Sequence, residues 1–392
     1  MMNRRTAIQE ILGAGFALSL APRLHALAEA GMGQNGHPHQ EAHKEMVAIG
    51  QQFMQQYFAP ALSVAIVRNS RFVYERPFGM AYPKGFEQTT SGTLFRIGTA
   101  SMPITSVAIF TLIEKGKMSL ADKVFGPNGI LGDAYKKKEY KQYVTDITVD
   151  HLLTHTCGGW PSDATDPMMH NNGWDAEKLI SSTIEDSALT SAPGTKWAYS
   201  NFGYFLLGRI IEKVSGMSYQ DYVKQTVLAP CGITAMHIAA NSLKERDPNE
   251  AEYLGQFNEK PYSINVSRMD SAAGWIASPS DMARFLTHVA GTPTIPSLLR
   301  PETIMLMTTP VAAYPQNSPA RYARGWMVAE NGKGLWFHYG TLPGSTSVIV
   351  RRPDSMCWSA ITSTRSLPAD TMTSALDKMV WDMVSQMPQW DS

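Results

Sequence analysis

Cysteine is scarce in this chain of 392 residues, which has only three. Cys157, Cys231 and Cys357 lie far apart and form no CxxC motif, so the spacing excludes the common cysteine-based metal and redox sites. We expect three buried thiols, with one disulfide as the alternative.

Other features are absent too. The 34 basic residues balance the 34 acidic ones, so no net charge attracts the protein to nucleic acid or anionic lipid. No segment after the N-terminal region approaches the roughly 20 apolar residues of a membrane span. A phosphate loop, a dinucleotide fingerprint and clustered metal ligands are all missing. We therefore expect a small-molecule or short peptide-like substrate, no cofactor and no metal. The sequence leaves the oligomeric state undetermined.

The N-terminus is more specific. Asn3–Thr6 carries paired arginines, Ile11–Ala21 is apolar, and the small-x-small stretch Ala26–Ala28 precedes Glu29. This layout is typical of a secretory signal peptide, and the arginine pair favours the twin-arginine route of bacteria. We expect residues 1–28 to direct export to the periplasm or the medium. An ordinary amphipathic first helix is the alternative interpretation.

The remaining chain predicts an α+β fold. Residues 29–45, rich in Gly, His and Gln, are expected to be a flexible lead-in, and 46–390 to be one folded domain. Strand signals gather at both chain ends, and mostly helical segments occupy about 119–299. We predict one antiparallel sheet built from both ends and flanked by helices, with a helical inserted subdomain. The expected strands are 61–67, 71–77, 325–329, 335–339, 345–351 and 357–364, and the expected outer helices are 46–57 and 368–386.

One early segment, FRIGTASMPIT from Phe95 to Thr105, combines a strand signal with a helix start. Pro103 suits the first turn of a helix, because the N–H it lacks would be unpaired there. Thr99 and Ser101 are therefore expected at a helix N-terminus, where N–H groups and the helix dipole favour negative charge. Helix capping by these two hydroxyls, and space filling by Met102, are the structural alternatives.

Four segments carry recognisable motifs, in this order: Phe95–Pro103, Ile147–Gly159, Pro193–Tyr204 with its Tyr-x-Asn triplet, and His338–Gly344 with its His-x-Gly triplet. Together they resemble the serine β-lactamase and penicillin-binding-protein-like superfamily, in particular its class C, esterase and D-aminopeptidase branch. Order and spacing agree from about residue 46 to 364, so the resemblance implies the fold of that superfamily.

In enzymes of this superfamily a serine attacks an ester or amide carbonyl, while a lysine three residues on and a tyrosine move its proton. Thr99 matches the serine and Met102 the lysine. The resemblance implies that the last strand helps to bind the substrate's carboxylate and oxyanion. It predicts Thr99, Tyr199 and His338 as catalytic residues, and Ser101, Met102, Asn201, Gly340 and Thr341 as substrate-binding residues.

The two departures remove the usual chemistry. A thioether can neither take up a proton nor carry a positive charge. Help from a positioned base is worth about 10²–10⁴ in rate, and the loss of a nucleophile costs about 10⁶. Tyr199 could act as the base, but an ordinary phenol titrates near ~10 and Met102 supplies no cation to lower that value. Moving the motif to Ser101 does not help, because Ile104 follows three residues later.

Three functions therefore compete. The first is an exported hydrolase-like enzyme that acts on an ester, amide or peptide-like acyl compound, with Thr99 as nucleophile and Tyr199 as base. The second is a lyase, isomerase or dehydratase in which Tyr199 and His338 transfer protons. The third is a binding protein without turnover. The intact Tyr-x-Asn and His-x-Gly triplets favour a catalyst.

Overall fold

The computed structural model describes residues 38–329 and 334–387. The predicted signal peptide, residues 1–28, lies outside the described residues. Within them, the three cysteines are buried and free, as predicted. No helix in this part of the chain is both long and apolar enough to cross a membrane.

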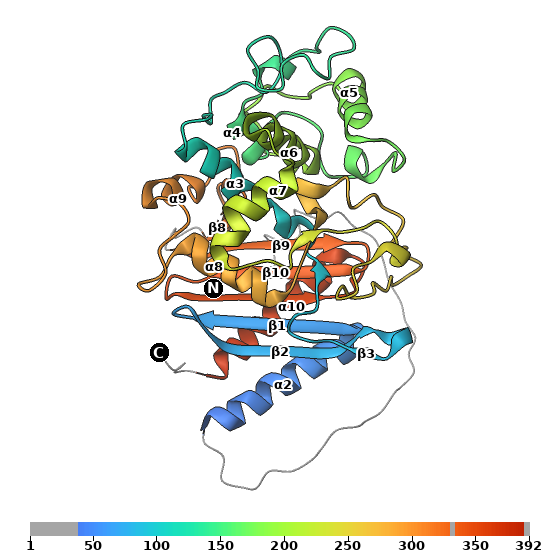
Figure 1. Cartoon of the computed structure of the whole chain (residues 1–392), viewed down its shortest axis with the longest axis vertical. Coiled ribbons are helices and arrows are strands. Elements are labelled where there is room, and N and C mark those ends of the chain that lie inside the picture. Colours follow the sequence, from blue (N-terminus) through green and yellow to red (C-terminus); the bar gives the residue numbers. More distant parts are fainter. Residues whose placement is uncertain (1–37, 330–333, 388–392) are drawn as a thin grey trace.

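An eight-stranded antiparallel sheet joins the two ends of the chain, and the predicted α+β class is confirmed (Figure 1). Its order is β3-β2-β1-β11-β10-β9-β8-β7, so the early strands pair with the last one through β1 and β11. The strands are β1 (Ala61–Arg68), β2 (Arg71–Tyr82), β3 (Glu87–Gln88), β7 (Ala320–Tyr322), β8 (Met327–Ala329), β9 (Trp336–Leu342), β10 (Ser345–Arg351) and β11 (Met356–Thr362).

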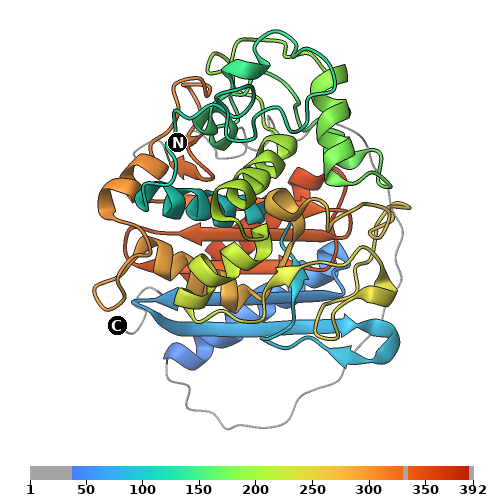
Figure 2. The same ribbon diagram turned by 45° about the horizontal axis from the view of Figure 1, so that its top comes forward.

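Helices cover both faces of this sheet because β1 is apolar on both of its faces. Leu62, Val64 and Ile66 share a core with α2 (Pro38–Tyr57) and α10 (Ala369–Ser385). The alternate side chains of β1 pack instead against α8 (Pro279–Ala290). Since successive side chains of a strand point to opposite faces, α8 lies on the face opposite α2 and α10. Figure 2 shows the same layers from a second direction.

Two predicted boundaries are corrected. Helix α2 begins at Pro38, so the part of the lead-in from residue 38 to 45 is helical rather than flexible. Its apolar stripe already starts at Ala42, which packs with Met46 and Phe53 in one core. The predicted helical insertion of 119–299 extends too far, because α8 packs on β1 and β11 and belongs to the sheet.

The rest of the helical part stands beside the sheet on the side of α8. Its centre is α3, whose residues are buried from Met102 to Leu112 and which packs against α6. In a small sheet, β6 pairs with β5 on one side and on the other with β4, the strand just before α3. The elements are α3 (Met102–Glu114), α4 (Val149–Leu153), α5 (Ala176–Asp186), α6 (Asn201–Ser215), α7 (Tyr219–Val223), α9 (Pro301–Met307), β4 (Phe95–Arg96), β5 (His237–Ile238) and β6 (Trp275–Ala277).

Candidate active site

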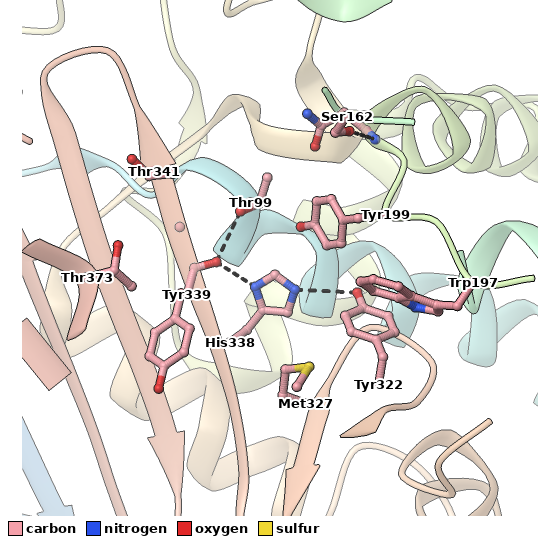
Figure 3. A pocket seen from close by; sticks show the side chains of 12 residues that line it. Thr99, Ser162, Trp197, Tyr199, Tyr322, Met327, His338, Tyr339, Thr341 and Thr373 are labelled. Atoms are coloured by element: carbon pink, nitrogen blue, oxygen red, sulfur yellow. Dashed lines mark hydrogen bonds between the residues drawn. The ribbon is translucent and has the colours of Figure 1, made fainter. Parts of the chain in front are cut away.

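A cavity of about 140 Å³ lies where β9, the 3₁₀ turn Gly98–Ser101 and the segment before α6 meet (Figure 3). Hydroxyl and aromatic side chains dominate its wall, and the described lining includes no Lys, Arg, Asp or Glu. The lining residues are Thr99, Ser162, Trp197, Tyr199, Asn201, Tyr322, Met327, His338, Tyr339, Gly340, Thr341 and Thr373.

Two glycines allow the 3₁₀ turn to approach β9 closely. A Cβ on Gly340 would lie 1.8 Å from the carbonyl oxygen of Ile97, so no larger residue fits there without movement. Gly98 has φ +54°, and its Cβ would lie 2.7 Å from the Thr341 nitrogen. Ser347 Oγ, on β10, donates to the same Ile97 carbonyl at 2.7 Å. This packing holds Thr99 against β9.

Thr99 presents its hydroxyl to the cavity but has no base beside it that is ready to act. Its Oγ1 donates to the carbonyl oxygen of Tyr339 at 3.0 Å (Figure 3). The Thr99 side chain also lowers the pKa of the neighbouring Tyr199 hydroxyl, which donates its own hydrogen to the Met102 sulfur. A backbone carbonyl can accept this hydrogen bond but cannot take the proton away, so the hydroxyl is oriented without being activated.

Met102 occupies the place behind Tyr199 where the resemblance puts a lysine. The side chain is fully buried, and its Sδ accepts the Tyr199 hydroxyl at 3.0 Å. The Tyr322 hydroxyl lies 4.0 Å from the same sulfur. The thioether therefore accepts from Tyr199 as a weak acceptor and lies beside Tyr322, where an ammonium group would have donated to both.

Tyr199 is held as a neutral phenol. Burial raises its pKa well above the ordinary value, and the hydrogen bond with Thr99 offsets only part of that rise. The ring lies 4.2 Å, centroid to centroid, from the buried imidazole of His155, whose Nδ1 accepts the Ser200 backbone N–H at 3.1 Å. Ser200 also caps α6 through its side chain, which fixes Tyr199 just before the helix.

His338 is also neutral, and its tautomer follows from its contacts. Nδ1 lies 2.6 Å from the Tyr339 carbonyl oxygen, which can only accept, so Nδ1 carries the proton. Nε2 is then an acceptor, and the Tyr322 hydroxyl lies 3.4 Å away from it. Burial lowers the pKa of His338 to about 4. At neutral pH the imidazole can accept a proton but offers no charge to a carboxylate.

Asn201 is fixed by the loop that precedes α5. Its Nδ2 donates to Asp166 Oδ2 at 2.7 Å, and its backbone N–H donates to Ser162 Oγ at 2.7 Å. Burial raises the pKa of Asp166, and hydrogen bonds from Met168, Asn201 and Ser162 oppose that rise.

Comparison with known proteins identifies the family. The Beta-lactamase family model matches residues 47–379. The chain belongs to the beta-lactamase family. It is 28% identical over 287 residues to the putative penicillin-binding protein PbpX of Bacillus subtilis, a match that covers 71% of this chain and 64% of that protein. Penicillin-binding protein 4* of the same organism is 30% identical over 188 residues, which are 45% of this chain and 37% of that protein. The chain thus spans less than two thirds of the length of either relative.

Solved structures share the beta-lactamase fold. The D-amino acid amidase of Ochrobactrum anthropi SV3 has a TM-score of 0.70 at 19% identity, covering 89% of this chain and 100% of that one. The octameric penicillin-binding protein homologue of Pyrococcus abyssi has a TM-score of 0.67 at 24% identity, covering 86% and 77%. The match of the family model over residues 47–379 confirms the superfamily resemblance seen in the sequence, and these structures share its fold.

Most of the predicted residues of this beta-lactamase family member meet at the cavity: Thr99, Tyr199, Asn201, His338, Gly340 and Thr341. Met102 does not line it and contacts two lining residues, Tyr199 and Tyr322, from behind. Ser101 is a correction. It is fully buried, its Oγ donates to the Gly98 carbonyl at 2.7 Å, and it accepts the Trp275 backbone N–H at 3.4 Å, so it faces away from a substrate. The 3₁₀ turn rotates its hydroxyl inward.

Sequence reasoning missed several lining residues. Trp197 stands two residues before Tyr199 inside a recognised motif, and alternation along that extended segment could have revealed it. Tyr322 comes from β7, which has only three residues and no readable periodicity. Ser162, Met327 and Thr373 lie in segments without a chemical signature.

Proposed function

We propose that this protein is an acyl hydrolase of the beta-lactamase family that uses Thr99 as a slow nucleophile and Tyr199 as a proton relay. One observation carries the proposal. Thr99 and Tyr199 both line the cavity, and the Thr99 side chain lowers the pKa of the Tyr199 hydroxyl, which donates its hydrogen to the Met102 sulfur. We also propose that residues 1–28 direct export to the periplasm or medium.

The raised pKa of Tyr199 argues against a stepwise path through a phenolate. A concerted path needs no phenolate. As Thr99 Oγ1 bonds to the substrate carbonyl carbon, its proton moves to the Tyr199 oxygen and the Tyr199 proton moves to the leaving-group oxygen. The bond between the acyl carbon and the leaving-group oxygen then breaks, which releases the alcohol and leaves an ester on Thr99. Water attacks that ester by the same path in reverse and releases the acid.

The composition of the cavity wall favours a substrate whose acyl part carries no negative charge. The described lining has no cationic side chain, and His338 is neutral near pH 7. A β-lactam or a peptide C-terminus would leave its carboxylate without a partner there, which costs binding energy. We therefore favour esters and amides that lack a carboxylate next to the scissile bond.

Steady-state hydrolysis of p-nitrophenyl acetate tests the proposal. Thr99→Ala should abolish turnover above background, and Tyr199→Phe should lower kcat by about 10²–10⁴, because Tyr199 moves the proton of the attacking hydroxyl. Thr99→Ser is the matched control, since it keeps the hydroxyl and removes a methyl group. Turnover that survives in Thr99→Ala would contradict the proposal.

One observation favours a second candidate function, a lyase or isomerase. His338 lines the cavity, its Nε2 is an acceptor 3.4 Å from the Tyr322 hydroxyl, and the pair could exchange protons with a substrate. Such an enzyme would lose activity in Tyr199→Phe and His338→Gln but keep it in Thr99→Ala. Binding of acyl compounds without turnover in any variant would instead indicate a binding protein.

A further inference from the structure

We infer that Asp166 turns Asn201 into a hydrogen-bond acceptor, and that the cavity therefore selects acyl compounds that present an N–H or ammonium group to Asn201 Oδ1. This inference deepens the proposed function and rests on it for the site concerned. Asp166 acts as a positioning residue, and Asn201 is the specificity-determining contact.

The polarity of Asn201 follows from its partners. Asp166 Oδ1 accepts the Met168 backbone N–H at 2.9 Å, and its Oδ2 accepts Asn201 Nδ2 at 2.7 Å. A carboxylate is an acceptor only, so the amide nitrogen of Asn201 must point toward Asp166 and the amide oxygen away from it.

The freed oxygen has no protein partner. Asn201 is 8% exposed, and its Oδ1 is buried without a hydrogen-bond partner among the described residues. Asn201 also lines the cavity. An unpaired buried acceptor costs free energy, and a ligand that donates a hydrogen to it recovers that cost. A ligand without a donor at this point does not.

The negative charge of Asp166 also favours a ligand that carries an N–H or ammonium group. Asp166 lies directly behind Asn201 and is 2% exposed, and no cationic residue is present in the described lining of the cavity. The other groups that face Asp166 are the neutral donors Met168 N–H and the Ser162 side chain, with His170 as a weaker charge. A negative charge in a poorly solvated wall favours an ammonium ligand over a carboxylate.

Two more residues that line the cavity, Trp197 and Thr341, have unpaired polar atoms that a ligand could contact. Trp197 Nε1, a donor only, and Thr341 Oγ1 are both buried and lack hydrogen-bond partners within the described chain. Figure 3 shows Trp197 and Thr341 on different sides of Tyr199. Asn201 and Trp197 both line the cavity, so an unpaired acceptor and an unpaired donor belong to its wall residues, and a compound with an N–H group and a carbonyl oxygen could pair with both.

The test measures binding, so it does not depend on turnover. Dissociation constants are determined by ligand-observed NMR for two matched pairs: N-benzylacetamide against N-benzyl-N-methylacetamide, and benzylammonium against benzoate. The wild type should bind the first member of each pair about tenfold or more tightly. Equal affinities, a preference for either second member, or no binding of any probe would overturn the inference.

Asp166→Asn is the decisive variant, because an amide at 166 lets Asn201 turn either way and removes the charge. Both preferences should fall to about twofold or less. Asp163→Asn is the matched control, since this exposed carboxylate in the same loop bonds only Thr165 in the described structure and should leave both preferences unchanged. Unchanged preferences in a folded Asp166→Asn would overturn the inference. If that variant does not fold, the wild-type pairs still decide the matter. Failure of the hydrolysis assay alone would refute the proposed function and leave these affinities standing.

Discussion

Replacement of Met102 by lysine should restore the missing proton acceptor. The Met102 sulfur lies 3.0 Å from the Tyr199 hydroxyl and 4.0 Å from that of Tyr322, so a lysine in the same direction would bring its amine to both phenols. The position is fully buried, and burial lowers the pKa of a lysine by up to about 3–5 units. A substantial neutral fraction near pH 7 could then take the Thr99 proton, for a gain of about 10²–10⁴ in ester hydrolysis.

The same burial sets a cost in stability. A fall of about 3 units in the pKa of the lysine corresponds to about 4 kcal/mol of unfolding free energy at pH 7, because the unfolded chain keeps that lysine charged. The cost should shrink as the pH rises toward the ordinary pKa of lysine, about 10.4. Domains of this kind have about 5–15 kcal/mol available, so Met102→Lys should fold with a lower urea midpoint.

The assay compares kcat/KM on p-nitrophenyl acetate for the wild type, Met102→Lys and Met102→Leu. Leucine keeps the volume but loses the sulfur, and its activity should stay within a few-fold of the wild type. The gain in Met102→Lys should disappear in the double variant with Thr99→Ala. A folded Met102→Lys with no gain in rate would refute the view that the lack of a base at residue 102 limits this site.

Three further predictions concern stability and geometry. Burial lowers the pKa of His338 to about 4, so the unfolded chain binds more protons than the folded chain between about pH 6.5 and pH 4. The free energy of unfolding, measured in urea titrations, should therefore fall by about 3 kcal/mol as the pH falls through that window. In His338→Gln the fall should be smaller. Gly340→Ala should separate the 3₁₀ turn from β9, lower the free energy of unfolding by about 1–3 kcal/mol and remove most ester turnover. Gly173→Ala is the control: its Cβ would meet nothing within 4 Å, so the melting temperature should change little. Arg268 donates to backbone carbonyls of the loop that carries Asp166, so Arg268→Met should lower stability by about 3 kcal/mol and weaken amide binding, as calorimetry and NMR titration would show.

The fold was accessible from sequence where the pattern was long enough to be read. Strand β10 has the predicted bounds, 345–351, and the hairpin of β1 and β2 lies where it was expected. Both cases combine β-branched residues with clear turn signals. Strand β7 was not predicted, because three residues carry no period and its pairing with β8 is decided by tertiary contacts.

The candidate site was predicted in composition but not in orientation. Motif order was enough to gather Thr99, Tyr199 and His338 at one cavity. It could not show that the turn before α3 points the Ser101 hydroxyl inward, or that the Asn201 side chain donates a hydrogen bond to Asp166. Those features depend on backbone rotation and on a loop distant in sequence, which residue spacing does not encode. Burial, the cause of the pKa shifts of Tyr199 and His338, is likewise a property of the folded chain.

Intact-protein mass spectrometry after exposure to a fluorophosphonate asks whether Thr99 is a correctly placed nucleophile that has only the neutral Tyr199, and no amine, to take its proton. We expect one slow adduct on the wild type, located on Thr99 by peptide mapping, absent in Thr99→Ala and formed at least about a hundredfold faster in Met102→Lys. An adduct that persists in Thr99→Ala, or a wild type that reacts as fast as Met102→Lys, would contradict this view of Thr99.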